Sequence, residues 1–150
     1  MTGVQQKIVI NDFQKVKAAM DILQFSLNKL NPFDASLLYT ADDYEPYDAL
    51  SDRFMRASEM FIKFFRSYER LQFAEESDTL RDQLNRMEKL GLISSTELWF
   101  RIRDVRNRIV HDYLPGKIKE IYDDIMGTFG DELKHDRLAI EIAMKDVADV

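Results

Sequence analysis

Apolar residues recur every three or four positions along most of the chain, the spacing that places them on one face of an α-helix. The longest stripe predicts a helix that begins at Pro46, a residue suited to a first helical turn. Its members are Tyr47, Leu50, Phe54, Ala57, Phe61, Phe64, Tyr68 and Leu71. A stripe from Phe13 to Leu30 predicts an earlier helix, capped by Asn11–Asp12 and ended by Asn31–Pro32, because the residue before a proline avoids the helical conformation.

The same spacing, combined with capping residues, predicts shorter helices in the second half of the chain. The first runs from Ser77–Asp78 to a left-handed end at Gly91, and the second from a capping box at Ser94 and Glu97 to Pro115–Gly116. The third runs from Ile118 to Met126 and is ended by Gly127, and the fourth runs from Asp131 to Val147. Residues 33–45 are acidic and lack a period, so we expect a long loop there. The fold class that follows is all-α: one domain over residues 1–150, built as an antiparallel up-and-down bundle of four or five helices.

The amino-acid composition excludes several kinds of functional site. The absence of Cys excludes a disulfide framework, a thiolate zinc site and a catalytic thiol, and two His residues argue against a histidine-rich metal centre. No apolar run approaches the roughly 20 residues that span a bilayer, and the N-terminus lacks a signal-peptide pattern, so we expect a cytoplasmic protein without membrane contact. A net charge of −6 argues against general affinity for nucleic acid.

The segment 99–114 predicts a helix with two faces to bury. At about 100° per residue, one narrow arc holds the core stripe of Leu98, Ile102, Val105 and Ile109. The opposite side interleaves aromatic, aliphatic and basic groups: Trp99, Arg103, Arg106, Asn107, Val110, His111, Tyr113 and Leu114. Such a mixture is typical of a protein–protein interface, and the simplest partner is a second copy of the chain.

The same face carries groups for acid–base chemistry on a phosphodiester. His111 can transfer protons at cellular pH, Arg106 offers a forked donor for phosphate oxygens, and Asn107 lies where it can orient the imidazole. Cleavage of RNA without a metal needs both a base and an acid, whereas one chain places a single His on this face. A two-fold dimer would supply both, and a local strip of four Arg residues (Arg101, Arg103, Arg106 and Arg108) would offset the overall acidity.

At these residues the chain resembles the HEPN superfamily. Arg106-Asn107-Arg108-Ile109-Val110-His111 matches its Arg-x4-His hallmark, and Tyr113 completes the Arg-x4-His-x-Tyr form of the HepT-like toxins that are paired with MNT nucleotidyltransferase antitoxins. Arg53, Arg56 and Glu59 resemble the family's second helix, and Leu90-Gly91-Leu92-Ile93 its turn into the motif helix.

The resemblance implies a metal-independent, dimeric endoribonuclease without a cofactor. Arg106 and His111 would be the catalytic pair with Asn107 as their support, and Tyr113 would be the residue that the antitoxin modifies with AMP. Arg103, Trp99, Val110 and Leu114 are expected to contact RNA or the second subunit. Tyr113 has an alternative as an aromatic residue that packs on Pro115.

An alternative function is also open, namely a non-catalytic, substrate-binding subunit of a nucleotidyltransferase. No metal site is expected, because the carboxylates at Asp42, Asp43, Glu45 and Asp48 are typical of a solvated loop. His135, between Lys134 and Asp136, is expected to be solvated.

Overall fold

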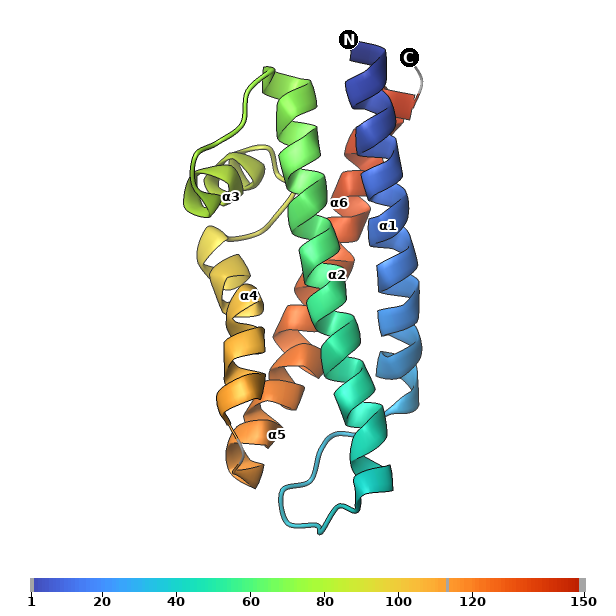
Figure 1. Ribbon diagram of the computed structural model, residues 1–150, viewed down its shortest axis with the longest axis vertical. Helices are drawn as coiled ribbons and strands as arrows, with labels where there is room; N and C mark the ends of the chain where they lie inside the picture. Colours follow the sequence, from blue (N-terminus) through green and yellow to red (C-terminus); the bar gives the residue numbers. More distant parts are fainter. Residues whose placement is uncertain (1, 113, 149–150) are drawn as a thin grey trace.

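The computed structural model describes residues 2–112 and 114–148, and every regular element within them is a helix (Figure 1). The long helices α1 and α2 lie side by side, α6 crosses behind α2, and α4 runs along the far side of α2 from α1. The elements are α1 (Thr2–Lys29), α2 (Ala41–Phe73), α3 (Leu80–Lys89), α4 (Thr96–His111), α5 (Pro115–Asp124), the π-helical turn η1 (Ile125–Phe129) and α6 (Gly130–Ala148). The predicted all-α bundle is confirmed.

The core is centred on α2, whose predicted stripe is buried. Phe61 and Phe65 are completely buried, and both rings pack against the indole of Trp99 on α4, with centroid distances of 5.5 and 5.2 Å. Burial of one such side chain contributes about 1.5–3 kcal/mol. These contacts fix α4 against α2 and thereby set the orientation of the face that α4 presents to solvent.

The first helix begins much earlier than the sequence suggests. It starts at Thr2, so Asn11–Asp12 lie inside it and the predicted cap is wrong. The apolar stripe continues through Val9, which is completely buried, and Asp12 is itself only 4% exposed. The Gln5 side chain donates to the Ser67 carbonyl at 2.9 Å and ties this extra length to α2.

The second helix also begins earlier, at Ala41, so the predicted loop 33–45 is shorter than expected and Pro46 lies within the helix. Thr40 and Asp43 form a capping box in which each side chain accepts from the other residue's backbone N–H. Asp42 and Asp43 therefore lie in the first turn, where negative charge is favourable. Asp42, Asp43, Glu45 and Asp48 are exposed, as expected, but they lie in the first turns of α2 and not in a loop.

The remaining loop is anchored by aromatic packing. Phe33 is 1% exposed and stacks on Tyr39 with a centroid distance of 4.4 Å. The Tyr47 hydroxyl on α2 donates to the Asn31 carbonyl at 2.6 Å. The loop between α1 and α2 is thus held to the end of the bundle.

The turn between α3 and α4 is predicted correctly at one end only. Gly91 takes the left-handed conformation (φ 77°) as expected, and Leu92 N–H donates to the Met87 carbonyl in the hydrogen bond that follows such a cap. The N-cap of α4 is Ser95, not Ser94, because the Ser95 hydroxyl accepts from Leu98 N–H at 3.2 Å.

The last three helical segments have different boundaries from those predicted. α4 ends at His111, and Pro115 opens α5 at its first turn, where its missing N–H loses no hydrogen bond. Gly127 does not separate two helices with a loop, since it kinks one nearly continuous path through η1 with φ −114° and ψ −113°. At Gly130 a Cβ would meet the Ile125 carbonyl oxygen, so this tight junction requires glycine.

Candidate functional site

The side of α4 that faces away from the core carries most of the predicted site. We call it the α4 outer face and define it as Arg103, Arg106, Asn107, Val110, His111 and Leu114, all of which are exposed. On the opposite side of the helix, Ile102 and Val105 are buried as the core stripe predicts. Val110 is 57% exposed and Leu114, just beyond the helix end, is 70% exposed.

Trp99 does not belong to this face, and its predicted interface role is wrong. Its side chain is 0% exposed, and its indole N–H donates to the Asp136 carboxylate of α6 at 2.8 Å. Thr96 and Trp99 are buried together with the core residues Ile102 and Val105. The Trp99 side chain contacts α2 through Phe61 and Phe65 and α6 through Asp136. Only the second half of the helix offers a wide exposed arc.

Tyr113, the predicted modification site, lies outside the described residues. Its neighbours Asp112 and Leu114 are extended, with ψ values of 117° and 134°. The chain has therefore left the helix before position 113.

The local Arg strip is smaller than the sequence suggests. Arg108 forms an ion pair with Asp124 of α5 at 2.9 Å, and the Arg101 guanidinium lies 5.4 Å from the centroid of the Phe129 ring. Arg103 and Arg106 face a different direction and line a cleft between α4 and α2.

This cleft has a volume of about 340 Å³ and brings together charges from two helices. Arg103, Arg106 and Asn107 line it from α4, and Glu59 lines it from α2. The Asn107 amide donates to the Asp104 carboxylate at 3.1 Å, so within one chain Asn107 is held by its own helix and not by His111. His111 lies five residues beyond Arg106, about 7.5 Å farther along the axis.

The cleft adjoins two further depressions over α2. One of about 460 Å³ is lined by Arg103, Lys63 and Arg66, and the other, of about 540 Å³ between α1 and α2, shares Lys63 and Arg66. An apolar groove farther along α1 and α2 has Arg53 and Arg56 at its rim. The cations that line these hollows form what we call the α2 cationic surface: Lys7, Lys15, Arg53, Arg56, Lys63, Arg66, Arg70, Arg103 and Arg106.

This surface concentrates positive charge on a chain of net charge −6. Its nine cations stand against five carboxylates lining the same hollows, and Glu76 forms ion pairs with Arg66 and Arg70 at 3.1 and 2.6 Å. A side-chain hydrogen bond with Lys63, together with the repulsion between the two ammonium groups, lowers the pKa of Lys15. A polyanion along this surface would relieve that repulsion.

The contribution of α2 to this surface was not predicted from the sequence. The signal is present, since Arg53, Arg56, Lys63, Arg66 and Arg70 follow one another at helical spacing on one side of α2. Their proximity to Arg103 and Arg106 depends on how α2 packs against α4, which no local pattern reveals.

Comparison with models of known families, with curated proteins and with solved structures finds no match for this chain. None of the described helices combines the length and the apolar character needed to cross a membrane.

Proposed function

We propose that the chain is a metal-independent endoribonuclease of the HEPN type, which acts as a homodimer and is neutralised by an MNT-type nucleotidyltransferase. The observation that carries the proposal is the exposure of Arg106 and His111 together on the α4 outer face, beside the α2 cationic surface.

The reaction needs two imidazoles in different protonation states. The neutral His111 of one subunit accepts the proton of an RNA 2′-hydroxyl as its oxygen attacks the phosphorus atom. The protonated His111 of the second subunit gives its proton to the 5′-oxygen as the P–O5′ bond breaks, leaving a cyclic 2′,3′-phosphate and a 5′-hydroxyl. Arg106 stabilises the charge that develops on the phosphoryl oxygens, because a guanidinium fits two such oxygens at once.

The α2 cationic surface gives the RNA a path to this site. Lys63 and Arg66 adjoin Arg103, which also lines the cleft of Arg106. Phosphates along these residues would provide affinity without sequence preference.

The direct test incubates the purified chain with single-stranded RNA in the presence of EDTA. Fragments that end in a cyclic phosphate support the proposal. Intact RNA, with a dimer present in the same sample, contradicts it and favours the alternative of a substrate-binding subunit of a nucleotidyltransferase.

The dimer is expected to form through the α4 outer face. Val110 and Leu114 expose apolar surface there, so Val110→Asp should place a charge in the interface and lower the mass in solution from twice the chain mass of 17.7 kDa to that of a single chain. Light scattering coupled to size-exclusion chromatography measures the change. Val4→Asp is the matched control, because Val4 is 64% exposed on α1 and its variant should stay dimeric. A dimeric Val110→Asp protein would place the interface elsewhere.

Neutralisation is expected to act on Tyr113. Co-production with a cognate nucleotidyltransferase should increase the mass of the chain by one or more AMP units. Each adenylate would add negative charge, which opposes the binding of RNA phosphates. Mass spectrometry of intact protein and of the peptide that contains Tyr113 measures it, with Tyr113→Phe as control. An unmodified wild-type chain that is nevertheless silenced would show that the partner acts by occlusion.

A further inference from the structure

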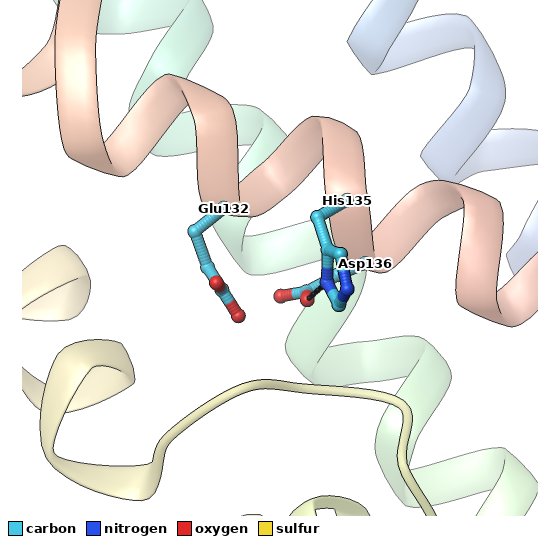
Figure 2. A group of neighbouring side chains, drawn as sticks. All are labelled: Glu132, His135 and Asp136. Carbon is cyan, nitrogen blue, oxygen red and sulfur yellow. Dashed lines mark hydrogen bonds and ion pairs between the residues drawn. The ribbon is translucent and has the colours of Figure 1, made fainter.

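A second group of side chains lies at the other end of α4, near the start of α6. Glu132, His135 and Asp136 share one face of α6 and point toward the loop between α3 and α4 (Figure 2). One donor atom from each side chain lies within 4.8 Å of the others. The three residues therefore offer one imidazole nitrogen and two carboxylate oxygens to a common point.

The two carboxylates are buried without a Lys or Arg partner among the described residues. Glu132 is 6% exposed and Asp136 is 0% exposed, and among the described residues no Lys or Arg forms an ion pair with either. The contact between His135 Nδ1 and Asp136 Oδ1 measures 3.1 Å. Buried carboxylates are stable only when a proton, a basic group or a metal ion compensates them.

Backbone and indole donors hold each carboxylate by one oxygen. Trp99 Nε1–H donates to Asp136 Oδ2 at 2.8 Å, and Ser94 N–H donates to Glu132 Oε2 at 2.9 Å. Asp136 Oδ1 then faces His135. Fixing one oxygen of a carboxylate with a hydrogen bond while the other stays available is how proteins orient metal ligands.

We propose that Glu132, His135 and Asp136 bind a divalent transition-metal ion, for which Zn²⁺ is the best match. Tetrahedral Zn²⁺ with bonds of about 2.0–2.2 Å holds its ligand atoms about 3.3 Å apart, and the His135–Asp136 contact of 3.1 Å is close to that spacing. An imidazole nitrogen disfavours Ca²⁺ and Mg²⁺, which prefer oxygen ligands. The His135 side chain is 60% exposed, so water can reach the fourth position.

The ion would act on the stability of the bundle, independently of the proposed RNA cleavage. Through Ser94 and Trp99 its ligands contact the α3–α4 loop and the buried half of α4. Trp99 and His111 are about 18 Å apart along the helix axis, so the ion lies outside the proposed catalytic site.

The experiment uses the tag-free, chelator-treated chain near neutral pH and titrates it with ZnCl₂. Calorimetry measures the heat of binding, and thermal unfolding measures Tm with and without the ion. We expect one Zn²⁺ per chain and a rise in Tm of about 5–10 °C at saturation. His135→Ala should lose both effects, whereas His111→Ala should keep both. These two residues are the only histidines of the chain, so the pair is a matched control.

Three results would overturn the proposal: no binding at about 100 µM Zn²⁺, an equal rise of Tm in His135→Ala, or an equal rise with MgCl₂ or CaCl₂. Asp136→Asn provides a second variant that keeps an oxygen for the Trp99 N–H. If the two carboxyl groups only share a proton, this variant is as stable as the chelator-treated wild type and Zn²⁺ changes neither. If they bind the ion, only the wild type gains stability.

Discussion

His111→Ala is expected to slow RNA cleavage by the purified protein about 10²–10⁴-fold, the usual contribution of a positioned acid or base. Both proton transfers fail together, because each subunit of the dimer loses its imidazole. His111→Gln should be equally inactive, since the amide can hydrogen-bond but cannot exchange a proton near neutral pH. The measurement is the initial rate on a fluorescent single-stranded RNA in EDTA, at protein concentrations where the dimer is intact.

Arg106→Ala should cause a loss of similar size through weaker stabilisation of the phosphoryl charge, with Arg106→Lys intermediate because it keeps the charge without the fork. Arg137→Ala is the matched control: it removes an Arg that pairs with Asp21 across α6 and α1, and it should cleave RNA like the wild type.

Full activity in His111→Ala would contradict the proposal that the chain is a nuclease. In cells, growth arrest by the wild type but not by His111→Ala supports it, and equal tolerance of both favours the substrate-binding subunit.

The outline of α4 and its core stripe could be predicted because helical spacing alone determines which residues share a face. Ile102 and Val105 are buried and Arg106 and Val110 exposed, as that spacing requires. The same reasoning failed at Trp99, because a helical projection assumes that every turn has the same neighbours. In the folded chain Trp99 contacts Phe61 and Phe65 of α2 and Asp136 of α6, whereas Arg106 and Val110, farther along α4, are exposed.

Helix starts were harder to predict because polar residues that cap a helix also occur inside one. Asp12 resembles a cap but lies buried in α1, whereas Asp43 resembles part of a loop but caps α2. The surroundings of His135 could not be predicted from the sequence for another reason. Ser94 and Trp99 are about 40 residues away along the chain and meet the α6 carboxylates only through packing.

Trp99→Ala is expected to destabilise the chain by about 3–5 kcal/mol, the range for truncating a completely buried aromatic side chain. The indole packs on Phe61 and Phe65, and its removal leaves a cavity among rings that cannot close around it. In a chain of this length the loss lowers Tm by about 10 °C, measured by circular dichroism in EDTA so that bound metal does not contribute. Phe100→Ala is the control. The ring of Phe100, the next residue along α4, is only partly buried, so its removal should lower the free energy of unfolding by less. A Trp99→Ala protein as stable as Phe100→Ala would mean that the indole faces outward, as the sequence pattern suggested.

Trp99→Phe separates the hydrogen bond from the packing. The smaller ring keeps most contacts with Phe61 and Phe65 but removes the N–H that Asp136 Oδ2 accepts. A buried oxygen that loses its donor costs about 1–3 kcal/mol, more than the change in ring size alone would predict. We therefore expect Trp99→Phe to lose a substantial part of the stability that Trp99→Ala loses. A Trp99→Phe protein as stable as the wild type would show that Asp136 does not depend on the indole, and the orientation of the α6 carboxylates would then need another cause.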